Sequence, residues 1–279
     1  MAQRIVMVAP NGARRTHADH TAIPITPDEL ATCAFECAAS GASAFHLHVR
    51  GDRQQHSIDV GRYREAIAAI KDRVPDLPIQ CTTEAAGVFS TDEQFAMVRE
   101  LRSAWVSFSL AEMMREGPQP ADDFLQWAHE AGTRIQFILY SPEDIDAFAA
   151  LHRAGDLHDD HPHLILVAGR YGLDDVSSCS HFDALYARLS ATGLADDTHW
   201  MTCAFGREEL ACLKRAMAVG SHVRVGFENA VVDHCGAPLQ DNAQRVRAVC
   251  EIAQVLGIEV SSYADVRKQL HIIPEHTAR

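Results

Sequence analysis

Short apolar runs alternate with longer amphipathic stretches along the whole chain. The runs are rich in β-branched and aromatic residues and are bounded by turn residues, which is the pattern of buried strands. They recur at a spacing of roughly 30 residues. We therefore expect strands at residues 4–10, 44–49, 78–83, 104–110, 134–140, 163–169, 199–205 and 222–228.

The stretches between these runs carry the periodicity of amphipathic helices. The first opens with a Thr-Pro pair, closes with Gly41, and so has both a start and a stop signal. Another opens at Ser90 with the spacing of a capping box. The clearest helical stretches are residues 26–41, 59–74, 90–102, 207–220 and 241–257.

Eight strands, each followed by a helix, predict a (β/α)8 TIM barrel formed by residues 1–279 as a single domain. The alternative is an open, doubly wound sheet. That fold would be expected to carry a glycine-rich phosphate loop after its first strand, and "APNGARR" at residues 9–15 is not GxGxxG. The barrel is the preferred interpretation.

Two histidines stand one residue apart in the second predicted strand, which reads "AFHLHVR". Alternate residues of a strand share a face, so His46 and His48 point the same way. If Leu47 and Val49 pack on the helices, both imidazoles enter the barrel at its carboxyl end, where barrel enzymes keep their sites. The pair is then half of a metal site, or two hydrogen-bonded core histidines.

The last predicted strand supplies further polar candidates. It ends at Glu228, whose carboxylate is expected to reach the same point as the two imidazoles or, alternatively, to cap a helix. Two histidines, one glutamate and a water make a typical catalytic zinc site. Arg224 shares the face of Glu228 and is interpreted as an anion binder or as part of a buried ion pair. Thr82 and Glu84 share a face at the end of the third strand.

Composition removes several classes of function. The net charge is −13 and the calculated pI is about 5.6, which disfavours a nucleic-acid binder. The three lysines lie in predicted helices or near the C-terminus, so Schiff-base chemistry is disfavoured. Eight scattered cysteines, no signal peptide and no long apolar run are typical of a cytoplasmic protein with reduced thiols.

Four segments together resemble the β-keto acid cleavage enzymes, typified by 3-keto-5-aminohexanoate cleavage enzyme. They are "HLHVR", "VRVGFEN", "QCTTE" and the opening "APNGA…DHTAIPITPDELA". The resemblance runs over nearly the whole chain. It implies a zinc-dependent TIM-barrel enzyme, often a homotetramer, that converts a β-keto acid and acetyl-CoA into acetoacetate and a new acyl-CoA.

The resemblance also implies roles for individual residues. His46, His48 and Glu228 correspond to the zinc ligands, and Arg224 corresponds to the catalytic arginine. The family's catalytic aspartate is replaced by Asn229, which cannot accept a proton, so the base would be Glu84 or Glu112. Alternatively, Arg224 and zinc act without a base, or the chain runs a related reaction.

Other departures from the family concern the substrate. Arg14 stands where the typical enzyme has the glutamate that recognises an amino group, which predicts a neutral or anionic tail. Thr82 replaces a serine, Glu84 a glycine and Glu112 a threonine, so these positions are expected to contact the substrate. A salt bridge between Arg14 and Glu84 is the structural alternative for those two.

Two other functions compete with this one. An amidohydrolase-like metal hydrolase is also a barrel with an HxH pair, but that type has the pair on strand 1, a lysine on strand 4 and an aspartate on strand 8. A non-catalytic metal- or ligand-binding barrel is the other alternative, which Asn229 keeps open.

Overall fold

The computed structural model describes residues 2–169 and 178–273, and within them eight parallel strands close into a barrel. The strands follow one another around the barrel in chain order, and the last pairs with the first. The predicted TIM barrel is confirmed. Its strands are β2 (Val6–Val8), β3 (Ala44–Leu47), β6 (Ile79–Thr82), β7 (Trp105–Ser109), β8 (Arg134–Leu139), β9 (His163–Ala168), β10 (His199–Ala204) and β11 (His222–Val225).

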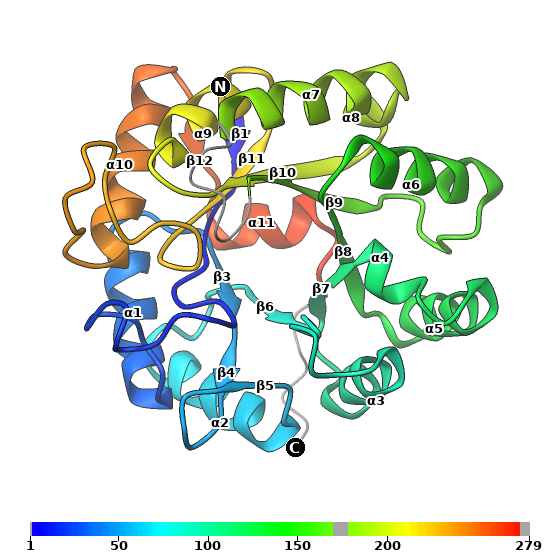
Figure 1. Cartoon of the computed structure of the whole chain (residues 1–279), viewed down its shortest axis with the longest axis horizontal. Coiled ribbons are helices and arrows are strands. Elements are labelled where there is room, and N and C mark those ends of the chain that lie inside the picture. The colour runs from blue at the N-terminus through cyan, green and yellow to red at the C-terminus, as the bar shows by residue number, and fades with distance from the viewer. Residues whose placement is uncertain (1, 170–177, 274–279) are drawn as a thin grey trace.

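Helices form a ring outside the strands, as Figure 1 shows in a view down the barrel. The five helices predicted most clearly are present, each within about two residues of the expected ends. The ring and its short additions comprise α1 (Pro27–Ala39), α2 (Val60–Arg73), α3 (Thr91–Leu101), α4 (Leu110–Met113), α5 (Pro118–Ala131), α6 (Pro142–Ala154), α7 (Ser178–Ala191), α8 (Leu194–Asp197), α9 (Glu209–Ala218) and α10 (Asn242–Val255).

A further helix, α11 (Tyr263–Gln269), lies behind the centre of the barrel in Figure 1. Its Val266 packs in one apolar cluster with Ile5 and Trp105, which lie at the amino-terminal end of the barrel interior. The helix therefore closes that end and leaves the carboxyl end for a site. Among the described residues, no helix is both long and apolar enough to cross a membrane.

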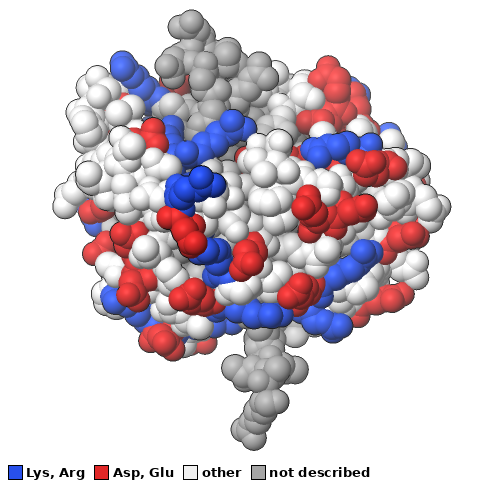
Figure 2. All heavy atoms as spheres, turned by 60° about the horizontal axis from the view of Figure 1, so that its bottom comes forward, with Lys and Arg blue, Asp and Glu red and all other residues white. Residues whose placement is uncertain are grey.

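Strand periodicity places side chains as the sequence predicts. Leu47 and Val49 belong to the apolar layer between strands and helices, so His46 and His48 face the barrel interior. On the outside, acidic and basic side chains are interspersed across the face shown in Figure 2.

Three predicted strands end at least two residues earlier in the barrel than expected, whereas the other five end one residue early. The first divides, because β1 (Gln3–Arg4) pairs with β12 (Glu259–Val260) outside the barrel. The second ends at Leu47, and β4 (Val49–Arg50) leaves the barrel to pair antiparallel with β5 (His56–Ser57).

The expectation that the last strand ends at Glu228 is wrong, because β11 ends at Val225. Gly226 turns the chain with a φ of +139°, and a Cβ there would collide with the carbonyl oxygen of Ala9. Glycine is the residue that adopts this conformation without a steric penalty.

Candidate metal centre and its cavity

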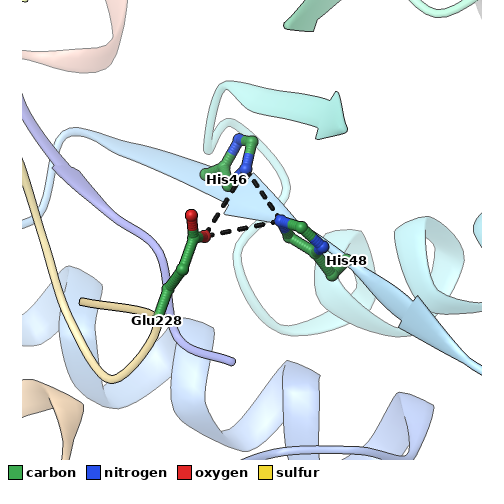
Figure 3. Close-up of side chains that lie close together, drawn as sticks. All are labelled: His46, His48 and Glu228. Carbon is green, nitrogen blue, oxygen red and sulfur yellow. Dashed lines mark hydrogen bonds and ion pairs between the residues drawn. The ribbon is translucent and has the colours of Figure 1, made fainter. Parts of the chain in front are cut away.

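His46, His48 and Glu228 converge on one point at the carboxyl end of the barrel, as Figure 3 shows. The Nε2 atoms of the two histidines are 3.0 Å apart. Glu228 Oε2 lies 3.6 Å from His46 Nε2 and 3.4 Å from His48 Nε2. All three side chains are buried.

These distances fit a metal ion. Ligand atoms about 2.0–2.1 Å from a tetrahedral ion lie about 3.3 Å from one another. The three atoms here are 3.0–3.6 Å apart, and all are nitrogen or oxygen atoms of side chains that ligate metals. All three residues also line the cavity described below, so the set could hold a divalent ion and leave room for a further ligand from the cavity.

A network of main-chain contacts holds Glu228 in the turn after β11. Its backbone N–H donates to Ala9 O at 3.1 Å, and the neighbouring Phe227 N–H donates to Asn242 Oδ1 at 2.8 Å. Arg15 donates to the carbonyl oxygens of both Phe227 and Glu228. The turn is fixed from three directions, so the carboxylate has a defined position although it lies outside the strand.

Arg224 occupies the other side of the Glu228 carboxylate. Its Nη2 lies 2.8 Å from Glu228 Oε1 and also donates to Cys203 Sγ at 3.4 Å. Of the two interpretations from the sequence, the buried ion pair is therefore present. The guanidinium also lines the cavity, so an anion binder remains a prediction.

Electrostatics favour the metal-binding forms of these side chains. Burial alone would raise the pKa of Glu228, but Arg224 and the two imidazoles outweigh it and hold the pKa well below its ordinary value. Burial, followed by the charge of Arg224, lowers the pKa of His46 well below its ordinary value. At neutral pH the carboxylate is ionised and the imidazole is neutral, which are the states that bind a metal.

A cavity of about 1110 Å³ opens above this centre. Eight of the nine site residues predicted from the sequence line it, and Asn229 is not among its described lining residues. The eight are Arg14, His46, His48, Thr82, Glu84, Glu112, Arg224 and Glu228.

Two carboxylates stand on one wall of the cavity. The Glu84 N–H donates to Thr82 Oγ1 at 3.0 Å, so these two residues form one local unit. Burial, together with the charges of Glu228 and Glu112, raises the pKa of Glu84 against the opposing effects of His48 and Arg14. Glu112 Oε2 accepts hydrogen bonds from Ala85 N at 3.1 Å and from the Gln94 side chain at 2.8 Å. Glu112 is thus more firmly held than Glu84.

Asn229 is fully buried. Its N–H donates to Gly226 O at 2.8 Å, while its side-chain amide has no hydrogen-bond partner among the described residues. Its role in the site stays a prediction.

Several polar residues of the site were not found from the sequence. Gln80 contacts His46, Cys203 contacts Arg224, and Tyr140 lines the cavity. Each lies within or directly after a predicted strand. The alternation of side chains along a strand could have identified Gln80, because it shares the inward face of Thr82.

Comparisons with known proteins find relatives that match nearly the whole chain. The profile of the beta-keto acid cleavage enzyme family matches residues 3–272. The chain is 27% identical to a 3-keto-5-aminohexanoate cleavage enzyme of Fusobacterium nucleatum, over 98% of this chain and 99% of the relative. It is 25% identical to a 3-oxoadipate:acetyl-CoA acetyltransferase of Cupriavidus necator, over 95% of this chain and 94% of the relative.

A solved structure has the same fold. The ternary complex of ObcA with a C4-CoA adduct and oxalate superposes with a TM-score of 0.71 at 17% identity. The match covers 89% of this chain and 67% of that one. At this identity the likeness shows the barrel fold alone.

Proposed function

Because the chain belongs to the beta-keto acid cleavage enzyme family, we propose that it transfers the acyl group of a β-keto acid to CoA. The keto acid R–CO–CH2–COO⁻ and acetyl-CoA would give acetoacetate and R–CO–CoA. The observation that carries the proposal is the triangle of His46, His48 and Glu228 at the floor of a cavity lined by Arg224 and Glu84.

The triangle would hold one zinc ion through two imidazole nitrogens and one carboxylate oxygen. Bound zinc would polarise the ketone and stabilise the enolate-like charge that develops during carbon–carbon bond exchange. The protein's own part is to place three desolvated ligand atoms close to one point. Arg224 adds a permanent positive charge beside the reacting anion, where low dielectric strengthens its effect.

We assign the proton transfers to Glu84. Asn229 has no acidic group, and one oxygen of Glu112 already accepts two hydrogen bonds. Glu84 lines the cavity, and its raised pKa makes its carboxylate a stronger base than an ordinary one. Thr82 accepts from the Glu84 N–H and so supports its position.

The substrate tail is proposed to be neutral or anionic. Arg14 is exposed and lines the cavity, so a guanidinium stands where an amino group would be repelled. The relative named for 3-oxoadipate takes a keto acid with a second carboxylate, which is compatible with such a group. The relative named for 3-keto-5-aminohexanoate takes one with an amine.

The assay uses purified protein, acetyl-CoA and β-keto acids with anionic, neutral and cationic tails, with and without a zinc chelator. We expect acetoacetate and the matching acyl-CoA from the anionic or neutral acids, and none after chelation. Hydrolysis without CoA would favour a metal hydrolase, and turnover of no compound would favour a binding protein. A homotetramer, as the family resemblance implies, is tested by light scattering on the same preparation.

A further inference from the structure

A series of hydrogen bonds between buried side-chain amides extends from His46 across the barrel interior. His46 Nδ1 lies 2.8 Å from Gln80 Oε1, and Gln80 Nε2 donates to Gln136 Oε1 at 3.1 Å. Gln136 Nε2 donates to the carbonyl oxygen of Leu164 at 3.4 Å. The side chains come from β3, β6 and β8, and the last hydrogen bond of the series is to the backbone of β9. All of these residues are at most 2% exposed.

The order of donors and acceptors along this series of hydrogen bonds is fixed at its last member, the carbonyl oxygen of Leu164. A backbone carbonyl only accepts, so the amide nitrogen of Gln136 must face Leu164. The oxygen of Gln136 then faces Gln80 and requires a donor, which fixes the nitrogen of Gln80 there. The oxygen of Gln80 is left facing His46. Met201 Sδ, 4.0 Å from Gln136 Nε2, is also an acceptor and reinforces the same order.

This order of donors and acceptors selects one tautomer of His46. A neutral imidazole carries one proton, and only an Nδ1–H can donate to Gln80 Oε1. Nε2 is then unprotonated, and it is Nε2 that faces His48 and Glu228. The alternative tautomer would set two acceptors, His46 Nδ1 and Gln80 Oε1, against each other at a buried position, which is costly.

We propose that Gln80 and Gln136 are positioning residues that hold His46 in its metal-binding tautomer before any metal arrives. The proposal rests on the metal centre of the proposed function. Groups that hydrogen-bond the second nitrogen of a ligand histidine fix its orientation and raise its basicity. Here the anchor is a main-chain carbonyl two side chains away from the ligand.

His48 differs from His46 in this respect. Its Nδ1 has no hydrogen-bond partner among the described residues. With His46 Nε2 unprotonated, the 3.0 Å contact between the two Nε2 atoms requires His48 Nε2–H as the donor. We therefore expect His48 to change tautomer when metal binds, whereas His46 keeps its own.

The first measurement is a two-bond 1H–15N spectrum of the metal-free protein, in which Nδ1–H and Nε2–H imidazoles have different patterns. His46 is assigned by its loss in His46→Gln. We expect His46 as Nδ1–H in the wild type and a mixture of tautomers in Gln80→Met. A wild-type His46 that is protonated on Nε2 would overturn the proposal.

The second measurement is zinc affinity by competition with a chromophoric chelator. Gln80→Met should lower the affinity by about 10–100-fold, as other changes behind a ligand histidine do. Ser107→Ala is the matched control, because Ser107 aligns with Gln136 on the adjacent strand and its hydroxyl has no partner among the described residues. Its affinity should stay within twofold of the wild type.

Loss of folding would not leave the question open. The double variant Gln80→Met/Gln136→Met leaves no amide unpaired and should recover stability while keeping the weak zinc binding. Wild-type affinity in both Gln80→Met and the double variant would refute the positioning role and leave the proposed function intact. A wild type that binds no zinc would refute the metal centre instead, and the spectrum would still test the tautomer.

Discussion

Arg224 and Glu228 form a buried ion pair in which only one oxygen of the Glu228 carboxylate contacts the guanidinium, while the other faces His46 and His48. Oε1 accepts from Arg224 at 2.8 Å, while Oε2 lies 3.4–3.6 Å from the two imidazoles. Arg224 thus keeps Glu228 ionised without occupying the oxygen that faces the metal position. The carboxylate and the guanidinium together connect the candidate metal centre to the cavity above it.

Replacement of Arg224 tests this arrangement. With zinc bound, Arg224→Met should keep the metal and lose roughly 10²–10³-fold in kcat, the usual effect of removing one stabilising charge or donor. Without zinc it leaves the buried Glu228 carboxylate without its guanidinium partner, which should cost about 3–5 kcal/mol of unfolding free energy. Chemical denaturation with and without zinc, beside a rate assay, measures both. A kcat within threefold of the wild type would remove Arg224 from the chemistry.

The charge at residue 14 should set substrate preference. Arg14→Glu reverses the charge at the cavity, so kcat/KM should fall for an anionic-tail keto acid and rise for a cationic-tail one. The ratio of the two is expected to change by at least about 100-fold, or 2.7 kcal/mol. Arg14→Gln, which is neutral, is the control and should fall between them. An unchanged ratio would mean that the tail binds elsewhere.

Glu84 should be needed for turnover more than for binding. Glu84→Gln keeps the shape and removes the base, so kcat should fall by about 10²–10⁴-fold with a small change in KM. Glu112→Gln is the matched variant on the same wall and should have the weaker effect on kcat. Steady-state kinetics on both variants decide the assignment. If Glu112→Gln is the more damaged enzyme, the base is Glu112.

His222, at the start of β11, predicts acid sensitivity of the fold. Its Nδ1 accepts from the Ile5 N–H at 3.0 Å, and burial, with the charges of Arg4 and His199, lowers its pKa from 6.5 to about 3. Between those values the unfolded chain binds more protons than the folded one. Stability therefore rises with pH across this window and is lost on acidification.

His222→Asn retains an acceptor for the Ile5 N–H but does not titrate. We expect the free energy of unfolding of the wild type to fall faster with acid than that of the variant, by up to about 1.4 kcal/mol per pH unit below pH 6.5. Urea unfolding at several pH values measures the difference. Parallel curves for the two proteins would show that His222 is not the titrating group.

Much of this site follows from strand parity and chain order. The period of a strand put His46 and His48 on one inward face, and the closed order of eight strands brought Glu228 beside them. The expected place of Glu228 at the end of the strand was wrong, because β11 ends at Val225 and Glu228 lies in the turn that follows Gly226. A φ of +139° at a glycine depends on its approach to Ala9, which the linear sequence does not contain.

The hydrogen bonds that connect His46 to Gln80 and Gln80 to Gln136 could not be predicted from the sequence. Gln80 and Gln136 belong to β6 and β8, which are not adjacent, so their contact depends on how the strands tilt across the interior. Parity shows that each side chain points inward but not which partner it meets. The roles of Glu84, Glu112 and Asn229 stay predictions for a related reason, since their chemistry depends on where the substrate lies.

The most direct test of the proposed acyl exchange is to trace isotopically labelled carbon from acetyl-CoA into the products. With acetyl-CoA labelled by 13C in its acetyl group, zinc-loaded protein and an active β-keto acid should give acetoacetate labelled only in its ketone and methyl carbons, with an unlabelled new acyl-CoA. The His46→Ala/His48→Ala variant lacks two of the three proposed zinc ligands. It should therefore hold less than about 0.1 equivalent of zinc and form neither product. Unlabelled acetoacetate, or wild-type turnover by the variant, would contradict a metal-dependent acyl exchange at this centre.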